Sequence, residues 1–272
     1  MAQAKGELLL NIENLEVVYH NVSTAIQGIT MQVYQNQIVG LLGTNGAGKT
    51  TILGAISGFL GVDEAKITEG FIDFQGEKIH NRPPHEITLR GIVLVPEWGK
   101  IFEHLTVEEN LEVCISSGER HFNRKDLYSR IFDYFPPLQT AKKRLAGYLS
   151  GGERQMLSLS TALLCVPRLL LVDELSLGLA PIVVGELMNL LKVIRDEQQI
   201  TVLLVEQDAL AALEIADYGY VIENGRIVFA GRPDRLRNHQ DIQEFYLGQG
   251  ARESRKSYRD VKQYRRTRRW YG

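Results

Sequence analysis

The sequence is short of the features that mark several protein classes. Only two cysteines occur among 272 residues, Cys114 and Cys165, far apart in apolar or neutral surroundings. This excludes a disulfide framework and predicts two reduced thiols in the core of a cytosolic protein. We find no N-terminal apolar signal and no apolar run long enough to cross a bilayer, so a membrane partner would be a separate chain. The six histidines match no zinc-ligand spacing.

Net charge is also small, at −2, so the bulk of the chain is not expected to bind a polyanion. From Arg252 onward, however, nine basic residues face two acidic ones, which gives +7 for this tail and −9 for the rest. Tyr258, Val261 and Tyr264 would share one face of a helix there. Such a helix could lie on an anionic membrane surface or bind nucleic acid, and a solvated, unstructured tail is the third interpretation.

Alternation of strand and helix patterns predicts an α/β fold with a mostly parallel sheet. The hydrophobic content of 44% is enough for one sizeable core, either one large domain or a core with a subdomain. An Asn224-Gly225 pair between apolar runs predicts a hairpin. Strands are expected at residues 8–19, 29–34, 37–42, 92–95, 169–172 and 201–205, and helices at 50–57 and 182–196. Residues 105–160 are mostly helical in pattern, with a break at Pro136-Pro137, and form the candidate helical subdomain.

A glycine-rich loop follows the strand at 37–42 and opens the helix at 50–57, which is the context of a phosphate-binding loop. Gly43, Gly46 and Gly48 lack side chains, so backbone N–H groups can face phosphates beside the positive end of the helix dipole. Lys49 would supply a charge to the β- and γ-phosphates, and the Thr50 hydroxyl would bind Mg²⁺. The alternative is a glycine-rich turn with an exposed lysine. The whole loop runs Gly43, Thr44, Asn45, Gly46, Ala47, Gly48, Lys49, Thr50.

Two acids end the apolar strand at 169–172. Adjacent buried carboxylates are costly unless they hold a cation or polarise water. Asp173 fits a Mg²⁺ ligand, usually through water, and Glu174 fits the general base that activates the attacking water. A solvated loop start after a core strand is the simpler interpretation.

The segment Leu149-Ser150-Gly151-Gly152-Glu153 is the most informative of the motifs. Ser150 is a small donor, and Gly151 and Gly152 expose N–H groups at a helix start, a geometry that suits a γ-phosphate. The same residues also predict a capping box, with Ser150 at the N-cap and Glu153 three residues later. The two interpretations are compatible.

Together these three motifs resemble the ATP-binding subunit of an ABC transporter over roughly residues 8–248. The resemblance implies a P-loop NTPase core, an antiparallel β subdomain and a helical subdomain near residues 98–160, with residues 249–272 left as the tail. It also implies that Ser150, Gly151 and Gly152 face nucleotide on a second ATPase subunit, that Thr51 contacts the α-phosphate, and that Tyr19 stacks on adenine. Tyr19 is equally readily an ordinary strand tyrosine.

Three departures from the general family pattern identify a branch. Glu97 replaces the usual Gln that contacts Mg²⁺, Gln207 replaces the usual His near the γ-phosphate, and the usual Asp is missing from residues 175–181. These features resemble the ATPase subunits of branched-chain amino acid importers. In that branch two ATPase subunits pair beneath two transmembrane permeases that a periplasmic binding protein supplies. Related importers carry urea, short amides or aromatic acids.

The resemblance therefore implies an ATPase that uses ATP and Mg²⁺ and works on the inner face of the plasma membrane. Trp98, beside Glu97, would either touch a permease or serve as a buried anchor. A non-transport ABC ATPase acting on nucleic acid is the alternative, although nucleic acid is not the partner we expect. A slow nucleotide-sensing module is a third, suggested by Glu97 and Gln207.

Overall fold

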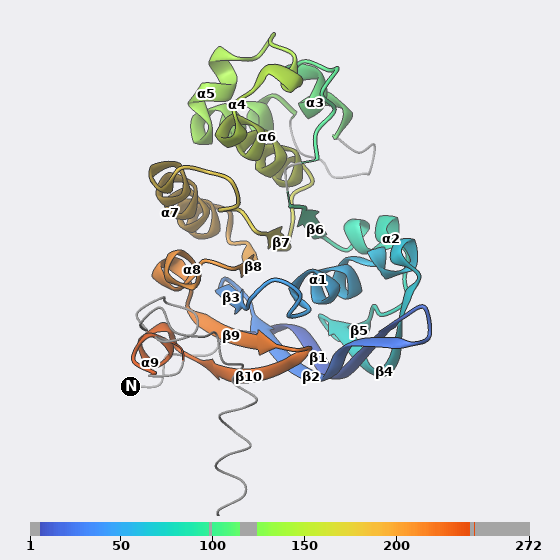
Figure 1. The fold of residues 1–272 in the computed structure, drawn as a ribbon. Coiled ribbons are helices and arrows are strands. Elements are labelled where there is room, and N and C mark those ends of the chain that lie inside the picture. Colours follow the sequence, from blue (N-terminus) through green and yellow to red (C-terminus); the bar gives the residue numbers. More distant parts are fainter. Residues whose placement is uncertain (1–5, 98–99, 115–123, 240–241, 243–272) are drawn as a thin grey trace, which may run out of the picture.

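The computed structural model describes residues 6–97, 100–114, 124–239 and 242. It consists of a six-stranded, mostly parallel sheet, a four-stranded antiparallel sheet and a helical part (Figure 1). The predicted fold class is confirmed. Trp98 and the basic tail lie outside the described residues, so the predictions made for them are not addressed by the structure.

The parallel sheet forms because its central strands are continuous apolar runs that are buried on both faces. Its order is β10-β9-β3-β8-β7-β6, and only the β9–β10 hairpin at its edge is antiparallel. Along β3 and β8, alternate side chains enter two separate apolar clusters, one on each face of the sheet. The strands are β3 (Ile38–Leu42), β6 (Ile92–Val95), β7 (Leu169–Asp173), β8 (Thr201–Glu206), β9 (Tyr218–Glu223) and β10 (Arg226–Gly231).

The antiparallel sheet covers one face of this core and has the order β2-β1-β4-β5. Its strands are β1 (Leu8–Tyr19), β2 (Ser23–Tyr34), β4 (Ala65–Phe74) and β5 (Glu77–Lys78). The sequence predicted β1 and only the second half of β2, and it predicted neither β4 nor β5. Gly28 (φ +67°) and Gly70 (φ +78°) explain this, because they lie next to bulges in the pairing and interrupt the alternation.

Helices of the core pack around the parallel sheet. They are α1 (Lys49–Ser57), the 3₁₀ helix Phe59–Asp63, α2 (Pro84–Leu89), α7 (Pro181–Gln198), α8 (Ala209–Ile215) and α9 (Pro233–Arg237). Proline at the first position of α2, α7 and α9 sets a helical φ where no intrahelical N–H bond is needed.

The helical part stands apart from the antiparallel sheet (Figure 1) and contains the predicted break at Pro136. Capping boxes open two of its helices, with Thr106 and Glu109 at α3 and with Ser150 and Glu153 at α6. Its helices are α3 (Val107–Val113), α4 (Arg124–Tyr134), α5 (Pro136–Thr140), the 3₁₀ helix Ala146–Tyr148 and α6 (Gly151–Leu164).

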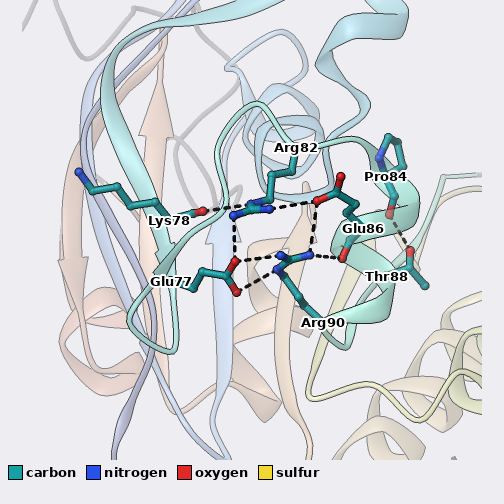
Figure 2. Close-up of polar contacts among 7 residues, drawn as sticks. All are labelled: Glu77, Lys78, Arg82, Pro84, Glu86, Thr88 and Arg90. Atoms are coloured by element: carbon teal, nitrogen blue, oxygen red, sulfur yellow. Dashed lines mark hydrogen bonds and ion pairs between the residues drawn. The ribbon is translucent and has the colours of Figure 1, made fainter. Parts of the chain in front are cut away.

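A network of ion pairs fastens α2 to β5 (Figure 2). Arg82 and Arg90 both bind Glu77, at 2.9 and 2.8 Å, and Arg82 also binds Glu86 at 3.0 Å. All four side chains are at least a quarter exposed, so the network orients α2 more than it stabilises the fold.

The two cysteines are not separated in space as they are in sequence. Cys165 Sγ lies 3.9 Å from the Cys114 carbonyl oxygen, and both residues are half-buried thiols outside any disulfide. The two predicted thiols are thus neighbours in the fold, because the C-terminus of α6 packs against the end of α3. Among the described residues, no helix combines the length and the apolar character needed to cross a bilayer.

Candidate phosphate-binding site

The predicted phosphate loop connects the end of β3 to the start of α1, where it wraps around the first turn of the helix. Gly46 and Gly48 have φ values of +77° and +107°, which side-chain-bearing residues rarely adopt. A Cβ at Gly43 would lie 2.6 Å from the Ile222 carbonyl oxygen. No side chain in the described part of the chain caps α1, so its first N–H groups point outward. The loop can therefore bind an anion at the helix N-terminus.

The turn between β9 and β10 packs against this loop and is hydrogen-bonded to it. The Gly225 N–H donates to the Ala47 carbonyl at 2.9 Å, and the Gly225 carbonyl accepts from Gln27 N–H at 2.8 Å. A Cβ at Gly225 would lie 2.1 Å from the Ala25 carbonyl oxygen. The turn predicted from Asn224-Gly225 is present and is packed directly against the loop.

Lys49 lies at the centre of the site and is only 4% exposed. Its ammonium donates to the carbonyl oxygens of Gly43 at 2.9 Å and Thr44 at 3.2 Å. It also lies 3.1 Å from Glu174 Oε1. The alternative of an exposed lysine on a glycine-rich turn is therefore wrong.

Asp173 ends β7, Glu174 directly follows it, and both side chains are buried, which excludes the solvated loop start. Burial raises the pKa of Asp173 to about 6, the Thr50 hydroxyl opposes this, and Glu174 and Glu97 raise it further. Asp173 Oδ1 is buried without a hydrogen-bond partner in the described chain. A buried carboxylate oxygen of this kind suits a cation ligand.

These residues surround one cavity of about 340 Å³. It brings together three segments that are distant in the sequence: the phosphate loop with the first turn of α1, Glu97 after β6, and Glu174 after β7. Ala25 and Leu177 also line the cavity. Their side chains carry no polar group, so no motif in the sequence predicted them as site residues. The lining residues are Ala25, Asn45, Gly46, Gly48, Lys49, Thr50, Thr51, Glu97, Glu174 and Leu177.

Tyr19 lies beside this cavity and not in its wall. Its hydroxyl is 3.2 Å from Thr51 Oγ1, and its ring packs partly against the core under the antiparallel sheet. The strand-tyrosine interpretation and the adenine-stacking interpretation are both compatible with this placement.

Ser150, Gly151 and Gly152 form the start of α6 in the helical part, away from α1 (Figure 1). The predicted capping box is present, since Ser150 Oγ accepts from Glu153 N–H at 3.3 Å and Glu153 Oε2 accepts from Ser150 N–H at 2.8 Å. This segment does not line the cavity around Lys49.

Gln207 directly follows β8 and is exposed, and the structure does not bring it into the cavity wall. Its neighbour Glu206 is instead fully buried, which sequence reasoning missed. The only signal was an acid that closes an apolar strand immediately before Gln207.

Comparisons with known proteins identify the family of the chain. A family model described as ABC transporter matches residues 26–176. The high-affinity branched-chain amino acid transport ATP-binding protein BraG of Pseudomonas aeruginosa is 37% identical and is matched over 88% of this chain and 100% of its own length. The probable branched-chain amino acid transport ATP-binding protein LivF of Archaeoglobus fulgidus is 36% identical, over 81% of this chain and 91% of its own.

A similar solved structure is an ATP-binding cassette of an ABC transporter in its ADP conformation. It matches with a TM-score of 0.73 at 28% identity and covers 89% of this chain and 99% of its own. The match therefore extends over both sheets and the helical part.

Proposed function

The chain belongs to the ABC transporter family of ATP-binding ATPases, and we propose that it energises an importer of branched-chain or other hydrophobic amino acids. The observation that supports this most is the match over the full length of BraG, together with the cavity that Lys49 and Glu174 both line. Glu97 and Gln207 are the branch-specific residues that accompany it.

ATP binding rests on the phosphate loop. The backbone of residues 43–48 and the start of α1 would hold the phosphates, and Lys49 would neutralise the β- and γ-oxygens. Thr51, whose hydroxyl lies 3.2 Å from the Tyr19 hydroxyl, would contact the α-phosphate, and Tyr19 would stack on adenine. An arriving triphosphate competes with Glu174 for the Lys49 ammonium, so binding ATP releases the Glu174 carboxylate.

The residues present fit a Mg²⁺ ion, because the partnerless Asp173 Oδ1 is an oxygen donor beside Thr50. Asp173, Thr50 and Glu97 would hold the ion. When bound, Mg²⁺ neutralises charge on the β- and γ-phosphate oxygens. Glu97 adds a negative charge where the general family pattern has an amide.

Hydrolysis then requires a base for the attacking water. Glu174 lines the cavity and is the carboxylate closest to Lys49. It would accept a proton from water as the water oxygen bonds the γ-phosphorus and the bond to the bridging oxygen breaks, which leaves ADP and phosphate. Gln207 would donate a hydrogen bond to a γ-phosphate oxygen after moving toward the site.

The start of α6 serves a second subunit in this proposal. Ser150, Gly151 and Gly152 lie outside the cavity that Lys49 lines, and the first N–H groups of α6 suit a γ-phosphate bound elsewhere. We infer that two ATPase subunits, identical or different, pair so that each completes the other's site.

The wider assembly follows from the same family membership. We infer two transmembrane permeases above the ATPase pair, an indirect supply of substrate from a periplasmic binding protein, and a position in the cytoplasm on the inner face of the plasma membrane. Residues 1–248 would be the ATPase domain, with residues 98–160 as its helical subdomain. Residues 249–272 would be a tail that contacts anionic lipid.

The test is ATPase activity of the purified chain, alone and then co-expressed with candidate permeases and a second ATPase subunit. We expect activity to appear or rise in the membrane complex and to respond to a binding protein loaded with leucine. Stimulation only by urea-, amide- or aromatic-acid-loaded binding proteins would change the substrate. Equal activity alone, or stimulation by DNA or RNA, would contradict the importer function.

A further inference from the structure

One buried acid near the site has no part in the proposed chemistry. Glu206, the last residue of β8, is 0% exposed. Burial raises the pKa of its carboxyl to about 7, the Ser176 hydrogen bonds oppose this, and the nearby acids Glu174 and Asp208 raise it further. A buried carboxylic acid is costly to keep, so its partners indicate what it does.

Both carboxyl oxygens of Glu206 bind one residue, Ser176. Oε1 accepts from the Ser176 N–H at 3.0 Å, and Oε2 shares a hydrogen bond of 2.6 Å with the Ser176 hydroxyl. Ser176 stands two residues after Glu174, in the loop that leads from β7 toward α7. Glu206 therefore holds the loop that carries the general base.

Glu174 itself has a strained backbone. Its φ is +46°, in the left-handed region, where a side chain costs about 1–3 kcal/mol and survives only if its surroundings fix it. On one side its N–H donates to the Val205 carbonyl at 2.9 Å. On the other side Glu206 holds Ser176. Consecutive residues at the end of β8 thus clamp the left-handed turn from both sides.

The same turn shapes the cavity wall. The Leu177 N–H donates to the Glu174 carbonyl at 3.2 Å, and Leu177 lines the same cavity as Lys49. Leu175, between the two clamped residues, is 1% exposed and packs into the core. Release of Ser176 would let residues 174–177 relax away from left-handed geometry and would move the Glu174 carboxylate.

We propose that Glu206 is a positioning residue for ATP hydrolysis, which through its two hydrogen bonds to Ser176 fixes the left-handed turn at Glu174 and aims the Glu174 carboxylate into the cavity. This inference rests on the proposed role of Glu174 as general base. We expect its effect mainly on turnover, because both of its hydrogen bonds hold the loop after β7 and neither reaches the phosphate loop.

The experiment compares four variants of the full chain, with kcat from ATPase assays, dissociation constants from fluorescent-nucleotide binding, and melting temperature as a check on folding. Glu206→Leu keeps the approximate volume and removes both hydrogen bonds, and Ser176→Ala removes one. Glu206→Gln can still accept from the Ser176 N–H and donate to its hydroxyl, and Ser176→Thr keeps the hydroxyl. The last two are the conservative rescues.

We expect kcat to fall about tenfold or more in Glu206→Leu and about threefold to tenfold in Ser176→Ala, in line with the loss of two bonds and of one. The nucleotide dissociation constant should change less than about threefold, a difference under 1 kcal/mol. The two rescues should keep kcat within about threefold of the unmodified chain. If Glu206→Leu does not fold, the Ser176→Ala and Ser176→Thr pair decides alone.

Unchanged kcat in Ser176→Ala and Glu206→Leu would overturn the proposal. A parallel loss of kcat, nucleotide affinity and melting temperature, without rescue by Glu206→Gln, would reduce Glu206 to a structural residue and overturn it as well. Glu174→Gln is the reference. Normal turnover in Glu174→Gln would overturn the assignment of Glu174 as general base. If Glu174→Gln is inactive while the Ser176 and Glu206 variants are fully active, only the positioning role of Glu206 is overturned.

Discussion

The Lys49 ammonium lies 3.1 Å from Glu174 Oε1, and at 4% and 10% side-chain exposure both groups are almost completely removed from water. The two residues come from different parts of the chain, α1 and the end of β7. Their pairing links the residue proposed to bind phosphate to the residue proposed to activate water. Each buried charge thus has a partner of opposite sign, and removing either one would leave an uncompensated buried charge.

Lys49→Ala should weaken ATP binding about 10- to 100-fold, because a charged hydrogen-bond donor to phosphate contributes on the order of 1.5–3 kcal/mol. The change also leaves the Glu174 carboxylate buried beside anionic phosphates. Fluorescent-nucleotide titration measures the effect. Lys66→Ala, at an exposed position of β4, is the matched control and should bind normally. Equal affinity of the two variants would contradict the phosphate-binding role of Lys49.

Asp173→Asn should raise the Mg²⁺ concentration needed for half-maximal ATPase activity about tenfold, since a neutral amide oxygen is a poorer ligand for a hard cation. ATP binding measured in EDTA should not weaken, because the variant removes a negative charge next to the phosphates. A Mg²⁺ titration at fixed ATP reads this out, with Asp196→Asn on the exposed face of α7 as control. An unchanged Mg²⁺ requirement would exclude Asp173 as a ligand.

Gly48→Ala should lower the free energy of unfolding by about 1–3 kcal/mol, because φ is +107° and the new Cβ would lie 2.7 Å from Ile26 Cδ1. Gly185→Ala offers the opposite case. Gly185 is an exposed helical residue of α7 with open space around its Cβ, so the change should stabilise by about 0.5–1 kcal/mol. Urea denaturation of both variants checks the pair. Destabilisation in both would show that the left-handed backbone at Gly48 is not the cause.

Glu206→Gln should gain stability relative to the unmodified chain as pH rises from 5 to 8. The folded state binds the Glu206 proton more tightly than the unfolded state, because its pKa is about 7 against 4.5. Its contribution is therefore fully present below pH 4.5 and is lost as pH rises through 7. The neutral amide avoids this loss, which is at most about 3 kcal/mol. Urea denaturation of both proteins at pH 5 and pH 8 measures their free energies of unfolding. If the difference between the two proteins is the same at both pH values, the raised pKa of Glu206 is contradicted.

The local motifs could be predicted from the sequence, whereas features that depend on strand register could not. The phosphate loop and the acids Asp173 and Glu174 are contiguous in sequence, so residue type and spacing locate them. The Glu206–Ser176 contact arises from the pairing of β7 with β8, which brings Asp173 opposite Val205. No spacing rule connects residues 30 positions apart in that way.

The antiparallel sheet illustrates the same limit. In β4, charged and polar side chains alternate irregularly around Gly70, where a Cβ would lie 2.3 Å from the Glu13 carbonyl oxygen. The glycine is required by β1, its partner strand, and not by its own neighbours in sequence. A pattern search along one segment cannot detect a constraint that belongs to another.

The contact between Gly225 and Ala47 bears on the order in which the chain is made. The phosphate loop occupies residues 43–50, yet its strand pairs with β8 and β9, and its backbone is supported by a turn almost 180 residues later. During synthesis, the ribosome has released the whole helical part before the first nucleotide-binding residues acquire their neighbours. Nascent chains that stop short of the β9–β10 hairpin should therefore fail to retain ATP. The capacity to bind nucleotide is thus gained only after the β9–β10 hairpin has been synthesised.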